Sequence, residues 1–412
     1  MSFEPAELYS SPNALARHYS RFRVEERVLL SGHSHQAWPD RAFDGMAAAF
    51  RDAAEHVDDK WERAVAKADR VREGYRALVG DPTGLYSLAS ATHDLLVKLL
   101  SALDWSARRR LVTTDREFYS LERQLRRLEE EGVEVARVAA HPAESVGERL
   151  AAAVDDQTTA VFVSTVFFSS GHVAGDLTPA AEACRRHGAP LVLDLYHQLG
   201  VVPFSLAEHG LEDAYAVSAG YKYLQLGEGN AFLRFPSDCD LRPVATGWFA
   251  EFGELTAPRG PGEVSYPAGH DRFAGATYDP TSHYRAAEVF DFFTEHELTP
   301  AFLRRVSQHQ IGRLCARFDE LDLDPRWIER DRDTPIERLG GFVCLQAPRA
   351  AEIRAALRED FSVFTDSRGS VLRLGPAPYL SDEQLDRAIE ALGEVVHRLA
   401  STPAGQPAAT GA

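Results

Sequence analysis

Cysteine is scarce in this sequence: the 412 residues include four, Cys184, Cys239, Cys315 and Cys344, and no two of them form a CxxC pair. A disulfide framework or a zinc knuckle is therefore poorly supported, and a reducing compartment is expected. No stretch approaches the roughly 18–20 apolar residues that span a bilayer, and the first residues lack the apolar core of a signal peptide. These absences predict a cytoplasmic protein with no membrane partner.

Positive charge is also in short supply. Lys and Arg number 45 against 62 Asp and Glu, which gives a formal net charge of −17 at pH 7. Such a surface would repel a phosphate backbone, so we expect no nucleic-acid partner. Hydrophobic residues make up 44% of the chain, which is ample for a large core, and the length suggests one large and one smaller domain.

Short apolar runs alternate with helical patterns from residue 84 onward. The runs lie at 85–89, 110–114, 133–138, 159–164, 190–194, 214–218 and 230–235. Helical patterns lie at 41–56 and 61–78 before them, and at 92–103, 119–131, 146–154 and 178–187 between them. The alternation is typical of an α/β fold with a mainly parallel sheet that helices cover on both faces. A ligand of such a sheet binds at the carboxyl ends of the strands.

The pattern changes after Pro243. Residues 246–282 are rich in Gly and Pro and predict an extended loop region. Helices are then expected at 283–295, 300–321, 350–359 and 382–399, and strands at 340–346 and 370–375, which together predict an α+β domain. We therefore divide the chain into an N-terminal arm (1–30), a large domain (31–282), a small domain (283–401) and a disordered tail (402–412).

Two short segments carry the strongest chemical signal. Asp194 ends one apolar run, and Lys222 follows another between Tyr221 and Tyr223. A buried carboxylate is costly unless a positive group pairs with it, and desolvation beside aromatic rings lowers the pKa of a lysine, as a Schiff-base amine requires. Pyridoxal 5′-phosphate (PLP) needs both groups, a Lys for the Schiff base and an Asp to keep the pyridine nitrogen protonated. Taken singly, Asp194 could instead cap a turn, and Lys222 could be a solvated loop residue.

The segment DLYHQLGVVPFSL (194–206), followed by YKYLQLGEGNAFL (221–233), resembles the class V, fold type I PLP-dependent enzymes, and within them most of all the kynureninases. The resemblance extends thinly from about residue 29 to residue 399. It implies an α/β large domain with a mainly parallel, seven-stranded sheet, and a smaller α+β C-terminal domain. It also implies that Lys222 holds the cofactor and later removes the α-proton of the substrate, while Asp194 sustains the ring as an electron sink.

Three more residues are placed against the cofactor by this resemblance. Thr92, in LASATHDLL, would give its hydroxyl to the phosphate at a helix start, where the helix dipole favours an anion. Phe118 would stack on the pyridine ring, and His197 would contact the ring hydroxyl. The alternatives are a plain helix N-cap for Thr92, a core position for Phe118 and an ordinary loop position for His197.

The phosphate is expected to meet three further side chains. Trp248, in TGWF, would point its indole N–H at the phosphate, and Tyr221 would contact the phosphate and also serve as a proton donor. Thr277, in FAGATYDP, resembles the residue that reaches the phosphate of the partner subunit. The resemblance therefore implies a homodimer with shared active sites.

The substrate residues are matched less closely. Arg373, in SVLRLGPAPY, resembles the arginine that binds the substrate α-carboxylate, which a guanidinium does well by paired hydrogen bonds. Arg368 is a weaker candidate with a structural alternative. A His-x-Asn-Tyr run of the kynureninases is STVFFSSG here, so Phe167 and Phe168 replace a polar pair in the substrate pocket.

Two histidines stand in an unusual N-terminal loop. His33 and His35 belong to SGHSH, where the kynureninases have D-G-N-S, and we expect them to contact the substrate. No third ligand has a spacing that fits a metal site, so no metal is expected. A desulfurase-like persulfide mechanism is not expected either, because the nearest cysteine, Cys344, lies in a strand-like run.

These features favour a kynureninase-like hydrolase that acts on an amino acid, cleaves its Cβ–Cγ bond and releases alanine. The altered substrate residues keep a second reading open, a PLP-dependent aminotransferase or a β- or γ-eliminating lyase of specialised metabolism. A third is a non-catalytic PLP-binding scaffold, since a fold does not fix a function. A requirement for an α-keto acid would separate the first two, and a cofactor spectrum that ignores added amino acids would indicate the third.

Overall fold

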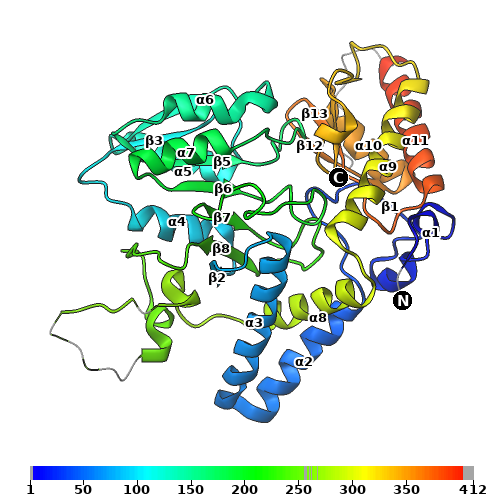
Figure 1. Ribbon diagram of the computed structural model, residues 1–412. Coiled ribbons are helices and arrows are strands. Elements are labelled where there is room, and N and C mark those ends of the chain that lie inside the picture. The colour runs from blue at the N-terminus through cyan, green and yellow to red at the C-terminus, as the bar shows by residue number, and fades with distance from the viewer. Residues whose placement is uncertain (1–2, 255–257, 259, 261, 267, 402–412) are drawn as a thin grey trace, which may run out of the picture.

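The computed structural model describes residues 3–254, 258, 260, 262–266 and 268–401. A large part built on a seven-stranded sheet lies beside a smaller part formed mainly by the last third of the chain (Figure 1). The tail that the sequence predicts to be disordered, 402–412, lies outside the described residues. None of the described helices has both the length and the apolar character needed to cross a membrane.

The large sheet has the mainly parallel character expected from the sequence. Its strands are β2 (Leu85–Ala89), β3 (Arg110–Thr114), β4 (Glu134–Val138), β5 (Thr158–Ser164), β6 (Leu191–Asp194), β7 (Tyr215–Ser218) and β8 (Ala231–Phe235). They lie in the order β2-β8-β7-β6-β5-β3-β4. Only β8 runs against its neighbours, β2 and β7, and the other pairings are parallel. The prediction of a mainly parallel, seven-stranded sheet is therefore confirmed.

Each face of this sheet has its own cluster of buried side chains. In β5, Ala160 and Phe162 belong to one cluster, while Val161 and Val163 belong to the other, because successive residues of a strand point to opposite faces. The covering helices are α4 (Thr92–Ala102), α5 (Tyr119–Glu130), α6 (Val146–Ala153) and α7 (Thr178–His187). Leucines of α4 and α5 join the first cluster, and apolar residues of α6 and α7 join the second. Burial on both faces explains why the strands are continuous apolar runs.

The smaller part is an α+β unit. Its elements are α9 (Pro300–Glu320), β9 (Glu329–Arg330), β10 (Val343–Gln346), α10 (Ala350–Phe361), β11 (Val363–Phe364), β12 (Asp366–Arg368), β13 (Val371–Leu374) and α11 (Asp382–Ser401). Four of its strands form an antiparallel sheet in the order β12-β13-β10-β9. The N-terminal segment, with α1 (Pro5–Tyr9) and the 3₁₀ helix η1 (Ala16–Phe22), adds β1 (Val28–Leu29), which pairs in parallel with β11.

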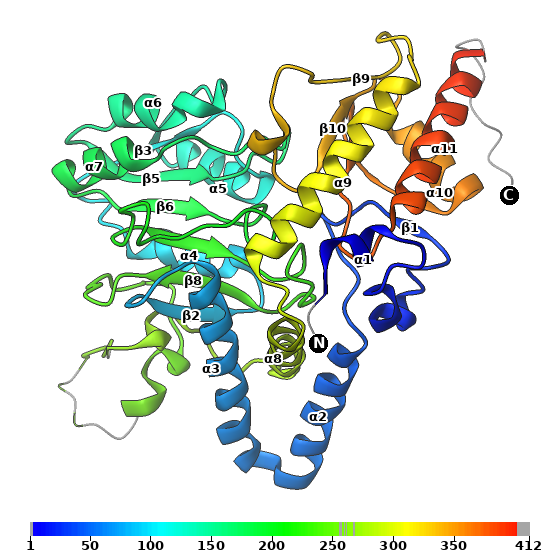
Figure 2. The same cartoon turned by 45° about the vertical axis from the view of Figure 1, so that its right-hand side comes forward.

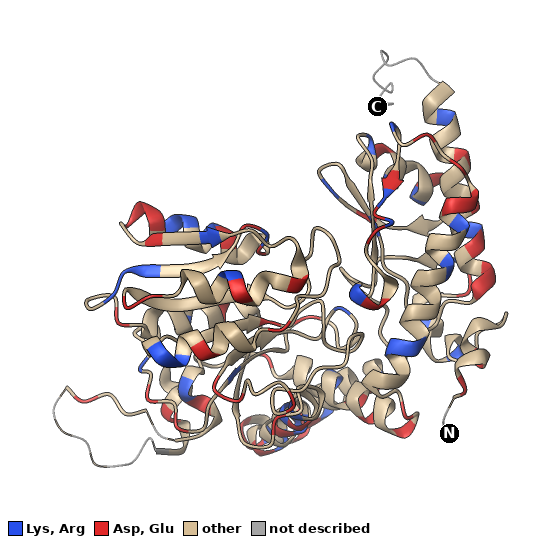
Figure 3. Cartoon of the chain, turned by 45° about the horizontal axis from the view of Figure 1, so that its top comes forward, with Lys and Arg blue, Asp and Glu red and all other residues tan. Residues whose placement is uncertain are grey.

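A pair of long helices projects from the large sheet (Figure 2). These are α2 (Arg41–His56) and α3 (Lys60–Leu78), and α8 (Thr281–Glu295) packs against both. The Gly- and Pro-rich loop region contains two 3₁₀ helices, η4 (Trp248–Glu254) and η5 (His270–Phe273), which the sequence does not predict. Acidic and basic residues are interspersed over the helices of both parts (Figure 3).

A buried ion pair fastens the antiparallel edge of the large sheet. Arg234 of β8 contacts Asp81, just before β2, with Nε–Oδ2 and Nη2–Oδ1 distances of 2.7 and 3.0 Å. Both side chains are enclosed, and Tyr86 donates a further hydrogen bond to Asp81. Burial alone would raise the pKa of Asp81, but the hydrogen bonds and charge of Arg234 bring it down to about 2.

We expect Asp81→Asn to destabilise the fold by about 3–5 kcal/mol, because it leaves the guanidinium of Arg234 buried without its counter-charge. Urea unfolding would measure this loss. The folded pKa of Asp81 lies below its ordinary value of 3.8, so the pair stabilises the parent above about pH 4, and this stability is lost as the pH falls toward 2.

A matched control is Arg126→Gln, which breaks the exposed Arg126–Glu122 pair on α5 and should change stability by no more than about 0.5 kcal/mol. Equal unfolding curves for the two variants would contradict a structural role for the buried pair.

Candidate active site

A cavity of about 300 Å³ lies at the carboxyl ends of the central strands, against the start of α4. This is the edge of the sheet where the sequence predicts a ligand. Residues from distant parts of the sequence converge on it. Six residues selected from the sequence line the cavity: Thr92, Phe118, Asp194, His197, Tyr221 and Lys222.

Lys222 is held in a tight turn after β7. The N–H of Gln225 donates to the carbonyl of Lys222, and that of Leu226 donates to Gly220. Gly227 closes the turn with a φ of +67°, and a Cβ at this position would lie 2.7 Å from atoms of Arg285 and Trp38. Only glycine fits such a conformation in such close quarters, so the GEG sequence after the lysine has a direct structural reason.

The Lys222 amine is enclosed by aromatic and imidazole rings. Its Nζ lies 2.8 Å from Nε2 of His197, 4.6 Å from the ring centroid of Tyr196 and 5.4 Å from that of Phe118. The side chain is buried, and this burial lowers the pKa of the amine to about 7, while the Asp194 carboxylate is the main group that acts in the opposite direction. Burial also holds the pKa of His197 well below its usual value, so a neutral imidazole faces the amine. The arrangement favours an uncharged, nucleophilic lysine.

Asp194 offers a carboxylate with spare acceptor capacity. Its Oδ1 accepts the backbone N–H of Tyr196 at 2.8 Å, and no other hydrogen bond to this carboxylate is found within the described part of the chain. Burial raises its pKa, and the N–H of Tyr196 and the charge of Lys222 offset this rise only in part. A protonated ring nitrogen in the cavity would supply a further positive charge and a hydrogen-bond donor.

The start of α4 provides a cradle for an anion. Thr92 is the first residue of this helix, and Ala91 before it is extended and has no capping side chain. Thr92 therefore is not the N-cap, and its hydroxyl hydrogen-bonds to the hydroxyl of Tyr196 at 3.1 Å. Uncapped N–H groups in the first turn and the positive end of the helix dipole favour a phosphate at this edge of the cavity. The lysine, the carboxylate and the helix start together fit PLP.

The substrate residues need one correction. Phe167 does not line the cavity: its ring is fully buried in the core beside His141. The next residue, Phe168, faces the cavity instead and packs edge-on against Phe118, with ring centroids 5.5 Å apart. A turn begins here, in which the N–H groups of Ser170 and Gly171 donate to the carbonyl of Phe167, and the two adjacent rings point to different sides of it.

His33 and Arg373 lie behind the cavity wall rather than in it. Arg373 is buried, forms an ion pair with Asp366 and donates to the carbonyl of Phe168 at 3.0 Å. Nε2 of His33 lies 3.6 Å from Asp366, and burial lowers the pKa of His33 to about 3. The carboxylate-binding role of Arg373 therefore stays a prediction, and it would require this ion pair to rearrange. Arg368 also contacts Asp366, at 2.9 Å, and is partly exposed.

Three other candidates lie at or beyond the rim. His35 is exposed, stacks on Tyr221 with centroids 5.0 Å apart, and lies 3.6 Å from Glu228 at the cavity mouth. Trp248 is 44% exposed in η4 and packs on Phe249 outside the cavity. Thr277 lines a neighbouring cavity of about 500 Å³, which shares Ser90 and His93 with the first. Within one chain, neither Trp248 nor Thr277 reaches Lys222.

Among the residues of the site that were not selected from the sequence, three bear on its chemistry. Tyr196 lies over the lysine amine, Ser164 lines the cavity at the end of β5, and Glu117 is buried beneath it. Tyr196 stands between Asp194 and His197 and could have been found from that position. Ser164 and Glu117 give no signal of their own, because single polar residues beside strand ends are common.

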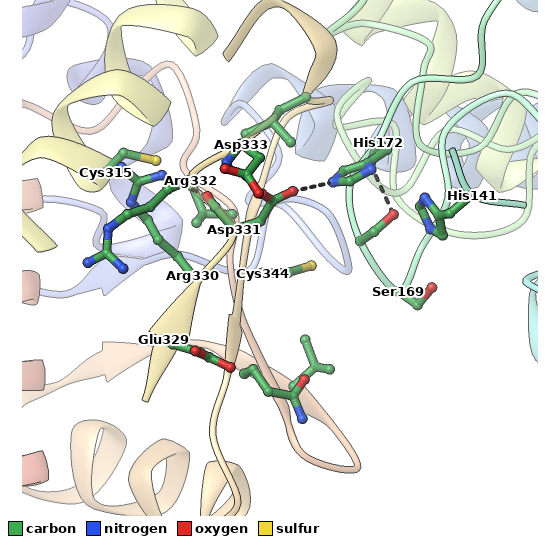
Figure 4. A pocket seen from close by; sticks show the side chains of 15 residues that line it. His141, Ser169, His172, Cys315, Glu329, Arg330, Asp331, Arg332, Asp333 and Cys344 are labelled. Carbon is green, nitrogen blue, oxygen red and sulfur yellow. Dashed lines mark hydrogen bonds and ion pairs between the residues drawn. The ribbon is translucent and has the colours of Figure 1, made fainter. Parts of the chain in front are cut away.

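A larger cavity, of about 540 Å³, lies between the two parts of the molecule (Figure 4). Four of its charged or titratable side chains already have partners: His172 pairs with Asp331 at 3.0 Å, and Arg330 and Arg332 both pair with Asp319. Cys344 lies here and not beside Lys222, and burial raises the pKa of its thiol to about 12. We therefore assign the chemistry to the smaller cavity, which has no cysteine in its wall.

Comparisons with known proteins bear on the fold and on the cofactor. No family model matches the chain. An uncharacterized aminotransferase, YcbU of Bacillus subtilis, is 23% identical over 85% of this chain and 90% of its own length. A kynureninase of Pseudomonas fluorescens is 28% identical over 61% of this chain, and the match spans 59% of that enzyme.

Solved structures give the fold. The apo cysteine desulfurase of Thermococcus onnurineus NA1 superimposes with a TM-score of 0.78 at 14% identity, over 94% of this chain and 98% of that one. A C-DES variant with glycine covalently linked to its PLP cofactor superimposes with a TM-score of 0.77 at 16% identity, over 92% and 98%. The resemblance seen in the sequence is thus confirmed at the level of fold: the chain has the fold type I architecture of the class V PLP-dependent enzymes.

Proposed function

We propose that this protein is a PLP-dependent enzyme that acts on an amino acid, with Lys222 as the residue that holds the cofactor. The observation that carries the proposal is the convergence of Lys222, Asp194 and the start of α4 on one cavity. Each of the three matches a different part of PLP, namely its aldehyde, its ring nitrogen and its phosphate. The kynureninase and aminotransferase relatives support the same conclusion.

PLP, when bound, supplies an electron sink for a carbanion at the substrate α-carbon. The residues of this chain supply the rest. Asp194 holds the proton of the ring nitrogen, Thr92 and the first turn of α4 bind the phosphate, and Phe118 covers the ring. Burial lowers the pKa of the Lys222 amine to about 7, so a free Lys222 amine would be able to accept the α-proton of the substrate near neutral pH. Tyr221, whose ring lies at the rim beside Tyr196, relays protons.

The reaction that we favour is kynureninase-like cleavage of the Cβ–Cγ bond, with release of alanine. Its support is the pair of segments around Asp194 and Lys222 and the kynureninase relative. Aminotransfer, or β- or γ-elimination, is the second candidate. Its support is Phe168, which presents an apolar ring where the kynureninases have a polar residue, and the aminotransferase relative, which spans more of the chain.

The active unit that we propose is a homodimer. Phe43, Met46 and Phe50 are exposed by 50%, 36% and 77%, and their spacing places them along one face of α2. Thr277 and Trp248 do not reach the cavity of their own chain. A second copy packed on this side would cover the apolar face and bring its Thr277 toward the phosphate site.

Borohydride reduction of the protein with PLP should trap the cofactor on Lys222. The chain has four lysines, Lys60, Lys67, Lys98 and Lys222, so peptide mass spectrometry can read the site directly. Lys222→Ala should lose the adduct, whereas Lys98→Arg should keep it, because the partly buried Lys98 donates to the carbonyl of Phe273 away from the cavity. Equal labelling of all four lysines would overturn the cofactor assignment.

Kynurenine and 3-hydroxykynurenine should yield alanine without any added α-keto acid. Chromatography would detect the alanine, and Lys222→Ala would serve as the negative control. If both compounds are inert while another amino acid reacts only with an α-keto acid present, the enzyme is an aminotransferase. Release of ammonia from an amino acid that carries a β- or γ-leaving group would identify a lyase.

Phe50→Asp should convert the dimer into monomers at micromolar concentration, because it places a charge in the apolar face of α2. Size-exclusion chromatography with light scattering would show the change. Arg51→Asp is the matched control, since it adds an acid at the next position, which points to another side of the helix. A monomeric parent would refute the proposed assembly.

A further inference from the structure

A buried carboxyl group lies beneath the cavity floor and joins two strand ends. Glu117 follows β3, and its Oε1 accepts from the hydroxyl of Thr114 at 2.7 Å and from the N–H of Ser164 at 3.2 Å. Its Oε2 lies 2.6 Å from the hydroxyl of Ser164. Thr114 ends β3 and Ser164 ends β5, the neighbouring strand in the sheet.

Ser164 connects this carboxyl group to the cavity. It lines the cavity wall, and in the sheet it is paired directly with Asp194 of β6. Glu117 does not line the cavity and is only 5% exposed. Glu117 can therefore influence a bound group only through the electric field of its charge or through Ser164.

Glu117 is a group that can change its charge in this position. Burial raises its pKa to about 7, and the nearby Asp194 adds to this rise, while the hydrogen bonds from Ser164 and Thr114 oppose it. The other charged residues of its loop, Asp115 and Arg116, are partly exposed and lie 3.9 Å from each other. Asp194 is the charged residue on the cavity side that affects the pKa of Glu117.

The two charge states of Glu117 leave Ser164 with opposite properties. An ionised Glu117 accepts a hydrogen bond from the Ser164 hydroxyl, so Ser164 can only accept a hydrogen bond from a group in the cavity. A protonated Glu117 donates its own hydrogen to Ser164, which frees the Ser164 hydrogen to point toward the cavity. One proton beneath the floor therefore changes Ser164 from an acceptor to a donor.

We propose that Glu117 is a positioning residue whose proton sets the direction of the Ser164 hydrogen bond and so tunes the group that binds beside Asp194. The inference rests on the proposed function, because the group that it tunes is the PLP ring. An ionised Glu117 favours positive charge on the ring and the lysine imine. A neutral Glu117, with Ser164 as a donor, disfavours it. A purely structural role, in which Glu117 only anchors the loop that carries Phe118, predicts no such effect.

The test compares Glu117→Gln, Ser164→Ala and the double variant with the parent, each loaded with PLP. A glutamine amide can keep all three hydrogen bonds, since its N–H₂ donates to Ser164 and its oxygen accepts from Thr114 and the Ser164 N–H. It therefore imitates a permanently protonated Glu117. We expect the apparent pKa of the lysine imine, read from its absorbance against pH, to fall by about one pH unit in Glu117→Gln, as for one hydrogen bond to a charged group.

Ser164→Ala alone should also shift the titration, and in this background the further effect of Glu117→Gln should shrink to a small fraction of its size. Urea unfolding of each apo protein controls for stability, and His197, Asp194 and Tyr221 are unchanged in all variants. Identical titrations of parent and Glu117→Gln, or an undiminished shift in the Ser164→Ala background, would overturn the inference. A parent that forms no imine band at all would overturn the proposed function instead.

Discussion

The neutral amine of Lys222 is the constraint around which the site is organised. An ammonium group in a cavity walled by Phe118, Tyr196 and the imidazole of His197 would be poorly solvated, so burial lowers the pKa of the amine to about 7 and favours its uncharged form. The same apolar surroundings make the Asp194 carboxylate costly until a cation arrives. The site is therefore complementary to a ligand that carries an electrophilic carbon, a protonated ring nitrogen and an anion. Binding of such a ligand would satisfy the lysine, the aspartate and the α4 helix start together.

The sheet explains how a chain brings these groups within reach of one another. Strands β5, β6 and β7 are neighbours: Ser164 is the last residue of β5, Asp194 is the last residue of β6, and the turn that carries Lys222 follows β7. Because parallel strands end on the same edge, residues far apart in the sequence meet there without any special packing. Helices cover both faces of the sheet, and one of them, α4, places its N-terminus at this edge. Strand direction and the position of one helix start thus bring the groups of the site together.

The sequence predicts the fold well because its signals are local and strong. The long helices and the buried strands show clear periodicity, and the predicted positions agree with the structure to within a few residues. The short strands β9, β11 and β12 carry too few residues for such a pattern. Lys222, Asp194, Thr92 and His197 could be selected because each stands next to an element end in a recognisable segment.

Side-chain direction and long-range pairing could not be predicted in the same way. Phe167 and Phe168 are indistinguishable until the local backbone decides which one faces the cavity. Arg373 lies in a segment typical of a carboxylate-binding arginine, yet its guanidinium forms an ion pair with Asp366, seven residues earlier. Glu117 looks like any loop glutamate in the sequence, and only the fold brings it against Ser164 of β5, beneath the cavity. Such pairings are decided by tertiary structure.

The pairing of β1 with β11 has a consequence for how the protein is made. Val28 and Leu29 leave the ribosome early, but their partners, Val363 and Phe364, are translated near the end. Until then, two apolar residues and their backbone groups have no strand to join. The loop that follows, with His33 and His35, is fastened at Gly375 through Gly32 and at Tyr221 through Gln36. The loop that lies behind the cavity wall and at its rim is thus fastened last, so a nascent chain truncated before residue 363 would have the sheet and Lys222 but not this loop in its final place.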